Sequence, residues 1–316
     1  MRVAITGARG FVGPHFSEAL RRLCGSGAEI IATSRVGGQH PVLGRVQPLD
    51  VTDRDAVTAF VAEVRPTHIM HLAAIAAPLM ASADPDAAWR IHVHGTLNLA
   101  RTILQESPDC WLLNAGSGLV YGESARAGHA LNEDTLLAPT DDYSVTKAAA
   151  DLALGAMARG GLKCIRLRAF NHTGPGQSDA FVIPALALQI ARIEAGLAPP
   201  VIRVGNLDVR RDFLDVRDVA DAYALVVKNA QQLQSATVLN IACGVARRIS
   251  EVLDKLVENC RTGVSIEKDP ARMRSSDLPI IVGDASRARR MLGWHPVRAF
   301  EDTLNAVLED ARLRVA

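Results

Sequence analysis

Short apolar runs alternate with amphipathic segments along the first half of the chain. Apolar runs without polar residues at alternate positions predict strands that are buried on both faces, as in a parallel sheet. The predicted strands are Val3–Thr6, Ile30–Thr33, Val46–Leu49, His68–Leu72, Trp111–Leu113 and Cys164–Leu167. Apolar residues recur at helical spacing between them, and the predicted helices are Pro14–Leu23, Asp55–Val64, Ala87–Gln105 and Val145–Ala158. This order predicts an α/β fold with a doubly wound parallel sheet.

The alternation of strand and helix ends after Arg168. A segment rich in Gly and Pro, Asn171–Gln177, predicts a loop, and a helix over Phe181–Ala195 and a short strand over Val201–Val204 are predicted to follow it. The later predicted elements are Asp215–Leu225 and Val238–Ile241, which could return to the main sheet, and the helices Ile249–Asn259 and Phe300–Arg312.

These elements predict two parts that fold as one unit with a cleft between them. We expect a first domain over residues 1–170, completed by parts of 205–242. A smaller C-terminal lobe is expected mainly over residues 171–316.

The composition narrows the class of ligand. The chain has 35 Lys and Arg against 34 Asp and Glu, a formal net charge of +1, so it offers no broad positive surface to nucleic acid or acidic membranes. The first strand begins at Arg2 with no basic and apolar leader before it, and no apolar run of about eighteen residues occurs. We therefore expect a cytoplasmic protein that binds small molecules, with no nucleic-acid or membrane partner.

Cysteines and histidines give no metal site. The five cysteines lack metal-ligand spacing, which favours reduced structural thiols. Of the nine histidines, His92 and His94 share one short stretch but have no third ligand at a sensible spacing.

A glycine-rich turn joins the first strand to the first helix. Gly7, Gly10 and Gly13 lie in this turn, and Phe11 and Val12 lie between the last two glycines. Glycines let the backbone approach phosphates, and the helix N-terminus supplies free N–H groups and a positive dipole end. The turn therefore predicts a Rossmann-type dinucleotide site.

The ends of the next strands indicate which dinucleotide binds. Ser34 and Arg35 follow the second strand, where NAD-dependent enzymes typically place an acid on the adenosine ribose. Arginine pairs well with a ribose 2′-phosphate, which favours NADPH, although NADH remains possible. Asp50 and Val51 follow the third strand and are expected to touch adenine. The nicotinamide half of the groove is expected along Leu72, Ala73 and Ala74.

Tyr143 and Lys147 are spaced to share one face of a helix. A free phenol has a pKa of about 10, so we expect the Lys147 ammonium to favour the phenolate. Ser117, at the end of an upstream strand, would hold a carbonyl oxygen between its hydroxyl and the phenol. Taken alone, the pair could be a solvated surface pair; with the glycine turn it predicts a hydride-transfer site.

The motifs TGxxGxxG, HLAA, S-x-x-V-Y-G (Ser117 to Gly122) and YxxxK, in this order, resemble the extended short-chain dehydrogenase/reductase family. Later blocks resemble its branch of GDP-4-keto-6-deoxy-mannose reductases, which make GDP-rhamnose: FNHTGPGQSDAFVI (Phe170–Ile183), VGNLDVRRDFLDVRDV (Val204–Val219), DPARMR (Asp269–Arg274) and GW-x-P (Gly293–Pro296). The resemblance implies NADPH as cofactor, a GDP-linked 4-keto-6-deoxy sugar as substrate, and a homodimer formed through two helices per subunit.

The same resemblance implies roles for single residues. Ser117, Tyr143 and Lys147 would be catalytic, with Tyr143 giving its proton to the sugar O4 and Lys147 also binding the nicotinamide ribose. The residues implied in substrate binding are Asn171, Val182, Arg211, Arg274 and Asp277. Alternatives remain open for three of these: Asn171 as a turn cap, Arg211 as the partner of Asp212 or Asp215, and Arg274 as a solvated side chain.

One position separates this chain from the related dehydratases, and two others depart from the family pattern. Leu119 stands where the related dehydratases have an acid, and an aliphatic side chain cannot remove the proton that elimination of water requires. His92 replaces the Asn of the family's N-V-x-G-T motif, and Gly116 replaces the first serine of a common pair.

The interpretation favoured by these residues is reduction of a nucleotide-linked 4-keto sugar. The alternatives are a 4-epimerase with tightly bound NAD and a reductase that forms the 6-deoxy-talose epimer, because the sequence does not reveal which face of the sugar meets the hydride. A non-catalytic dinucleotide sensor on the same fold is a third alternative.

Overall fold

The computed structural model describes residues 1–273 and 278–316 of the chain. The strands of the main sheet are β1 (Arg2–Thr6), β2 (Glu29–Ser34), β3 (Gly38–His40), β4 (Gly44–Pro48), β5 (His68–His71), β6 (Trp111–Ser117), β7 (Cys164–Ala169) and β11 (Thr237–Ile241). They form one eight-stranded sheet in the order β11-β7-β6-β5-β1-β2-β4-β3. All neighbours are parallel except β3 and β4, so the predicted doubly wound parallel sheet is confirmed.

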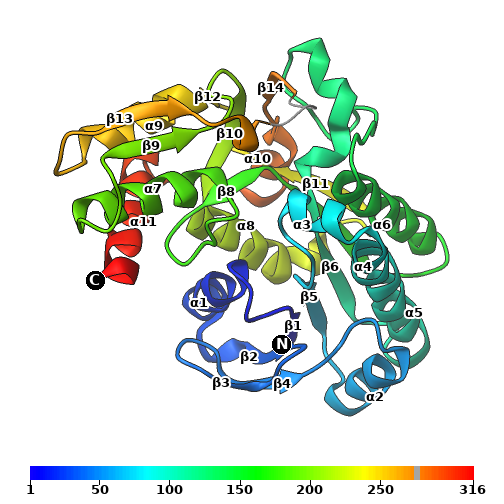
Figure 1. Cartoon of the computed structure of the whole chain (residues 1–316). Coiled ribbons are helices and arrows are strands. Elements are labelled where there is room, and N and C mark those ends of the chain that lie inside the picture. Colours follow the sequence, from blue (N-terminus) through cyan, green and yellow to red (C-terminus); the bar gives the residue numbers. More distant parts are fainter. Residues whose placement is uncertain (274–277) are drawn as a thin grey trace.

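Helices cover both faces of this sheet (Figure 1). On one face, Phe16 of α1 (Val12–Cys24) and Tyr223 of α8 (Val216–Asn229) share a buried cluster with Ile5. On the other face, the buried cluster joins the sheet to α2 (Arg54–Val64), α5 (Thr96–Glu106) and α6 (Asp142–Ala158). The central strands are buried by both helical layers, which is why they appear in the sequence as continuous apolar runs.

The helix predicted over Ala87–Gln105 is continuous but irregular. After the short helix α3 (Pro78–Ala83), the chain runs through α4 (Pro85–Ala88) and a π-helical turn over Trp89–Gly95 into α5. Single π turns inside helices often lie at functional sites. This one contains the buried His92.

Helix α6 begins before its predicted start. Asp141 accepts a hydrogen bond from the backbone N–H of Ser144, and Ser144 in turn bonds the backbone of Asp141, so a capping box fixes the first turn. Tyr143 and Lys147 therefore lie in the first two turns of this helix, as their spacing predicted.

The C-terminal lobe has its own apolar core. The lobe is built from α7 (Val182–Glu194), β9 (Val201–Val204), α9 (Ile249–Glu258), β13 (Ser265–Lys268) and α11 (Phe300–Val315). Figure 1 shows these elements gathered to one side of the main sheet, with β9 beside β13. Leu186 and Leu304 are buried where α7 packs on α11.

A small sheet lies between the lobe and the main domain. It contains β8 (Asn171–Thr173), β10 (Arg210–Asp215), β12 (Ala246–Arg248) and β14 (Ile280–Ile281), with β10 in the middle. The loop prediction for Asn171–Gln177 was therefore wrong at its start, because Asn171–Thr173 pairs with β10. The remaining elements are α10 (Ser286–Leu292) and short helical turns at Gly25–Gly27, Gly118–Ala127, Ala230–Gln232 and Pro270–Arg272.

Two predicted segments lie beside the main domain after the lobe has begun. Val238–Ile241 belongs to the edge strand β11, and Asp215–Leu225 falls mostly in α8, which packs against α1. Within residues 1–273 and 278–316, no helix is long and apolar enough to cross a membrane.

A buried ion pair ties α6 to the sheet. The Nε and Nη2 atoms of Arg168 on β7 donate to the two carboxylate oxygens of Asp151 on α6, at 3.0 and 2.9 Å. Arg168 also donates to the Tyr121 hydroxyl at 3.0 Å, and Tyr121 donates to Asn240 of β11 at 2.7 Å. Arg168 is 4% exposed and Asp151 1%, so neither charge could be solvated if its partner were lost.

We predict that Asp151→Asn lowers the free energy of unfolding by about 3 to 5 kcal/mol, because it leaves the buried Arg168 guanidinium without a counter-charge. Chemical denaturation measures this change. Asp109→Asn is the control: it breaks an exposed pair with Lys163 and should leave stability unchanged. Equal effects of the two substitutions would contradict the role assigned to the buried pair.

Candidate active site

The glycine-rich turn between β1 and α1 lies against the segment that follows β5. Gly7 has φ +67°, and a Cβ built on it would come within 2.6 Å of the Ala73 Cα. A Cβ on Gly13 would come within 2.0 Å of the Ala8 carbonyl oxygen. These two glycines are therefore required by close backbone contacts, and Gly10 lies between them at the surface of the turn. The structure thus brings the predicted phosphate turn and the predicted nicotinamide segment together.

The N-terminus of α1 has the character of an anion site. Phe11 is its N-cap, no side chain in the described part of the chain caps the first turn, and that turn, which begins at Val12, holds no acidic residue. The Gly13 N–H donates to the Gly10 carbonyl oxygen at 3.2 Å and Pro14 has no N–H, so the positive end of the helix dipole is the main feature that favours a negatively charged ligand. These features fit the diphosphate of a nicotinamide dinucleotide.

The ends of β2 and β4 lie beside this turn. Ser34 is the last residue of β2 and Arg35 follows it with an exposed side chain. The Asp50 carboxylate accepts from the backbone N–H and the hydroxyl of Thr52, at 2.8 and 2.7 Å, which fixes the turn after β4. Val51 is buried and packs close to Gly95.

Arg9 is a residue that the sequence analysis missed. Its side chain is exposed, and its Nη1 atom lies 3.4 Å from the carbonyl oxygens of both Gly37 and Gln39, in the segment that follows Arg35. The sequence feature that could have indicated this role is a basic residue inside the glycine turn, between Gly7 and Gly10. Two arginines therefore border the end of β2.

The three predicted catalytic residues come together below the carboxyl end of β6. Tyr143 is 9% exposed, and its phenol lies near enough to the side chain of Ser117, the last residue of β6, for that side chain to affect its pKa. The Lys147 Nζ atom lies 6.0 Å from the centre of the Tyr143 ring and donates to the Ala115 carbonyl oxygen at 3.0 Å. Ser117 Oγ also accepts from the Leu119 N–H at 3.1 Å.

Burial sets the protonation of this group. Burial raises the pKa of Tyr143, the Ser117 side chain opposes that rise, and the charge of Asp141 adds to it. Burial also lowers the pKa of Lys147 to about 8. Burial is the largest influence on the phenol, and it favours the protonated form that a proton donor requires. That Lys147 favours the phenolate stays a prediction.

The structure shows the surroundings of Gly116 and Leu119, the positions singled out in the sequence. A Cβ on Gly116 would lie 2.8 Å from the Leu167 carbonyl oxygen, so a serine there would displace the neighbouring strand. Leu119 packs against the small apolar cluster that contains Tyr143, Ala81 and Ala88. The position that would need a base for dehydration is thus filled by an aliphatic side chain in apolar contact.

The predicted substrate residues lie on the small sheet and the lobe. Asn171 begins β8 opposite Phe213 of β10, so Arg211 is close by on the neighbouring strand. The Arg211 Nη1 atom donates to the Leu278 carbonyl oxygen at 2.8 Å. Val182, the first residue of α7, is largely open to solvent. Arg274 and Asp277 lie outside the described residues.

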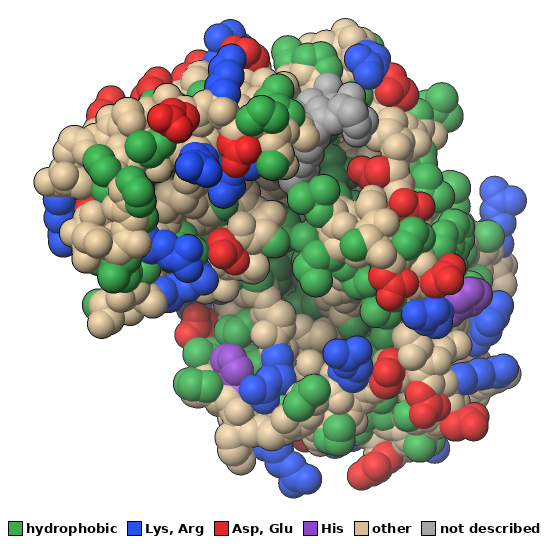
Figure 2. Space-filling view, in the orientation of Figure 1, with side chains coloured by type: hydrophobic (Ala, Val, Ile, Leu, Met, Phe, Trp, Pro, Cys, Tyr) green, Lys and Arg blue, Asp and Glu red, His purple; other side chains and the backbone are tan. Residues whose placement is uncertain are grey.

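His172 is a second residue that the sequence analysis did not assign. Its ring stacks on Phe11, with centroids 6.0 Å apart and an interplanar angle of 4°. The glycine-rich turn therefore touches strand β8, which carries Asn171. Figure 2 shows the surface hollowed between the lobe and the main domain, with hydrophobic side chains along its walls. No spacing in the sequence predicted this contact, since the rings come from segments far apart in the chain.

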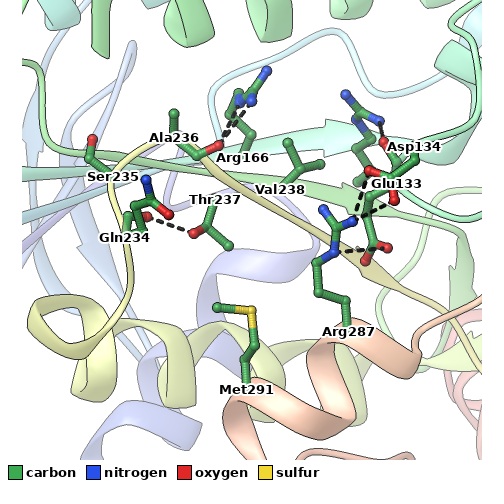
Figure 3. Close-up of a pocket in the computed structure, with 11 residues that line it drawn as sticks. Glu133, Asp134, Arg166, Gln234, Ser235, Ala236, Thr237, Val238, Arg287 and Met291 are labelled. Atoms are coloured by element: carbon green, nitrogen blue, oxygen red, sulfur yellow. Dashed lines mark hydrogen bonds and ion pairs between the residues drawn. The ribbon is translucent and has the colours of Figure 1, made fainter. Parts of the chain in front are cut away.

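A polar pocket of about 520 Å³ lies elsewhere, at the outer edge of the main sheet near β11. Figure 3 shows Arg287 directed at Glu133 and Asp134, and Arg166 bonded to the Ala236 carbonyl oxygen. Arg166 also pairs with Asp151. These arginines already have partners within the protein, so the pocket holds no uncompensated charge for a ligand.

Comparison with known proteins agrees with this geometry. Residues 3–242 match the model of the NAD dependent epimerase/dehydratase family. The chain is 33% identical to GDP-6-deoxy-D-mannose reductase of Pseudomonas aeruginosa, over 99% of this chain and 98% of that protein.

Two solved structures extend the comparison. RMD from Pseudomonas aeruginosa complexed with NADPH has a TM-score of 0.86 at 30% identity, with 99% of each chain covered. UDP-glucose 4-epimerase of Thermus thermophilus, in complex with NAD, has a TM-score of 0.85 at 27% identity, again over 99% of each chain.

The matched family model covers most of the chain, and the reductase of Pseudomonas aeruginosa aligns over nearly the full length of both proteins. The chain therefore belongs to the NAD dependent epimerase/dehydratase family, among the extended short-chain dehydrogenases/reductases, and is an NAD(P)-dependent enzyme of the oxidoreductase type.

Proposed function

We propose that this enzyme reduces the 4-keto group of a nucleotide-activated 4-keto-6-deoxyhexose with NADPH. The substrate we assign is GDP-4-keto-6-deoxy-D-mannose and the product GDP-D-rhamnose. The observation that carries the proposal is the buried Tyr143, which lies near Ser117 with the Lys147 Nζ atom 6.0 Å from its ring centre. The similarity to a GDP-6-deoxy-D-mannose reductase supports the choice of sugar and nucleotide.

Each catalytic residue has a distinct task in this proposal. The bound dinucleotide supplies a hydride to the sugar C4. Tyr143 gives its phenolic proton to the forming alkoxide at O4, and the Ser117 hydroxyl donates a hydrogen bond to the same oxygen. The Lys147 ammonium stabilises the phenolate that Tyr143 becomes, and it also binds the nicotinamide ribose. Fixed geometry supplies a large part of the acceleration.

We propose that ligands divide between the two parts of the molecule. The main domain, with Gly7–Gly13 and the ends of β2, β4 and β5, holds the dinucleotide. The lobe and small sheet hold the nucleotide sugar, with Asn171 and Arg211 at its diphosphate and Val182 at the wall of the site. Arg274 and Asp277 are assigned to the nucleotide from the family resemblance alone.

The rival 4-epimerase uses the same three catalytic residues but retains NAD. Arg35 and Arg9 at the end of β2 favour a cofactor with a 2′-phosphate and so a reductase. Leu119 disfavours dehydration, because an aliphatic side chain cannot remove the proton that elimination of water requires. The 6-deoxy-talose-forming reductase differs only in the face of the sugar that receives hydride, so product analysis separates it.

We also propose a cytoplasmic homodimer. Leu152 on α6 is 59% exposed, and Trp89 and Val145 beside it also reach solvent. These apolar side chains lie on helices that the family resemblance assigns to a dimer contact. Burying them against a second copy would remove apolar surface from water.

We expect the enzyme to oxidise NADPH when given GDP-4-keto-6-deoxy-D-mannose and to release GDP-D-rhamnose. Loss of nicotinamide absorbance and chromatographic identification of the sugar measure this. Tyr143→Phe should lower kcat by roughly 10²- to 10⁴-fold while NADPH still binds, because only the proton donor is removed. Turnover by the variant at the original rate would show that another group gives the proton.

Arg35→Glu should lower the NADPH-to-NADH ratio of kcat/KM by roughly 10- to 100-fold, since a carboxylate repels the 2′-phosphate that the guanidinium would bind. Steady-state kinetics with both cofactors measure the ratio. Arg101→Glu makes the same charge change at an exposed site on α5 and should leave the ratio unchanged. An unchanged ratio in Arg35→Glu would exclude Arg35 as the phosphate ligand.

We predict that kcat/KM falls as the pH rises above about 8, because in the free enzyme burial lowers the pKa of Lys147 to about 8, so its ammonium loses its proton there. The pKa of Tyr143 is raised, so the phenol does not account for a fall near pH 8. The pH dependence of kcat/KM between about 6 and 10 tests this, since it reports the groups of the free enzyme. Lys147→Arg, if active, should lack the fall, since guanidinium stays charged. A wild-type profile that is flat to about pH 9 would contradict it.

A further inference from the structure

His92 is buried against the catalytic helix, in the π-helical turn between α4 and α5. It is 2% exposed, and both ring nitrogens have partners. Nε2 lies 3.0 Å from the backbone nitrogen of Ile75 and 3.1 Å from its carbonyl oxygen. Nδ1 lies 2.8 Å from the Thr146 hydroxyl on α6. One ring thus joins the segment after β5 to the helix that carries Tyr143.

The ring bonds to both segments in either neutral tautomer. The Thr146 hydroxyl lies 2.8 Å from the Asp142 carbonyl oxygen and 3.0 Å from that of Tyr143. When this hydroxyl donates its proton into the helix, it accepts from Nδ1–H of His92, and Nε2 accepts from the Ile75 N–H. When it donates to Nδ1 instead, Nε2–H donates to the Ile75 carbonyl oxygen.

Burial and the charges that face His92 keep its ring neutral. Burial, then the Lys147 ammonium and more weakly His71, lower its pKa to about 3, while the bond to Ile75 opposes this. Burial and the Lys147 charge also lower the pKa of His71 to about 3. The ring is therefore neutral at any working pH and keeps one bond to each segment.

The two segments that His92 joins both hold Tyr143 in place. Helix α6 carries Tyr143, and the segment after β5 packs against its side chain. Ile75 follows Ala73 and Ala74, and its side chain packs in the apolar cluster that contains Tyr143. The His92 ring itself stands edge-on to the Tyr143 ring, with centroids 5.6 Å apart and an interplanar angle of 89°. Any movement of His92 would therefore change the spacing between the loop and the phenol.

We propose that His92 is a positioning residue that clamps the Ala73–Ile75 segment against α6 and so sets the position of the Tyr143 hydroxyl relative to the bound nicotinamide. Its bonds to Ile75 and to the Thr146 hydroxyl make the clamp. The inference deepens the proposed function and rests on it for the reaction measured. Misplacement by about 1 Å can cost roughly 100-fold in rate, so such a clamp matters for kcat.

Two conservative variants separate the two bonds. The Gln side chain can place its oxygen near the Nε2 position, so His92→Gln keeps an acceptor for the Ile75 N–H. The Asn amide nitrogen reaches only the Nδ1 position, so His92→Asn keeps a donor for Thr146 and loses the Ile75 bond. Thr146→Val removes the partner on the other side. His94→Ala is the matched control, since His94 is exposed in the same turn.

The first arm needs no substrate. Hydrogen–deuterium exchange of the backbone around Ile75 should be faster in His92→Ala and His92→Asn than in the wild type, and nearly unchanged in His92→Gln and His94→Ala. Thermal unfolding is recorded for each variant to show that the fold is intact. Unchanged exchange at Ile75 in His92→Ala would overturn the clamp.

The second arm measures kcat and KM with the GDP-4-keto sugar and NADPH. We expect kcat to fall roughly 10- to 100-fold in His92→Ala, with a smaller fall in His92→Gln and in Thr146→Val and little change in the KM for the sugar. A kcat that falls only in proportion to the loss of folded protein, or does not fall, would overturn the positioning role. If His92→Ala does not fold, the comparison of His92→Gln with His92→Asn decides in the same way.

The two proposals fail differently. No turnover by the wild-type enzyme would exclude the proposed substrate, and the exchange arm would still decide the clamp. Normal wild-type turnover with no effect of any His92 variant would retain the proposed reaction and exclude the clamp.

Discussion

The site depends on the order of the strands, because the chain extends the sheet first on one side of β1 and then on the other. From β1 the chain builds β2, β4 and β3 to one side, and then crosses to β5, β6, β7 and β11 on the other. Connections that leave in opposite directions open a crevice at the carboxyl ends of the strands. Gly7, Ala73 and Ser117 all follow or end such strands, and the close contact of Gly7 with Ala73 closes the floor of the crevice.

Burial gives this crevice its chemistry. Helix α6 is held to the sheet by the Asp151–Arg168 pair, and its first two turns place Tyr143 and Lys147 where solvent is largely excluded. The same exclusion that raises the pKa of the phenol lowers that of the ammonium. Burial thereby favours the neutral form of each group more than water does. In the proposed reaction, solvent would screen little of the attraction between the Lys147 ammonium and the phenolate that remains when Tyr143 gives its proton to the sugar.

Much of the main domain could be predicted from the sequence because its strands are buried on both faces and its helices are amphipathic. The glycine turn and the Tyr143–Lys147 spacing were local patterns, so their places on the fold followed directly. The strands β8 and β10 were not predicted, because β10 has the sequence RRDFLD and its pairing depends on segments distant in sequence. The π-helical turn, the stack of Phe11 on His172 and the reach of Arg9 to the end of β2 are likewise features that depend on tertiary contacts, and no periodicity records them.

Phe11 is the N-cap of α1, in the proposed dinucleotide site, and it also stacks on His172 of β8, beside the proposed sugar site. In the proposed binding mode the two sites share one aromatic wall. A ligand that immobilises this wall would lower the entropy cost of binding the second ligand, and by linkage each would raise the affinity for the other equally. Cooperative assembly of the ternary complex would then require a contact between two rings and no movement of the lobe as a whole.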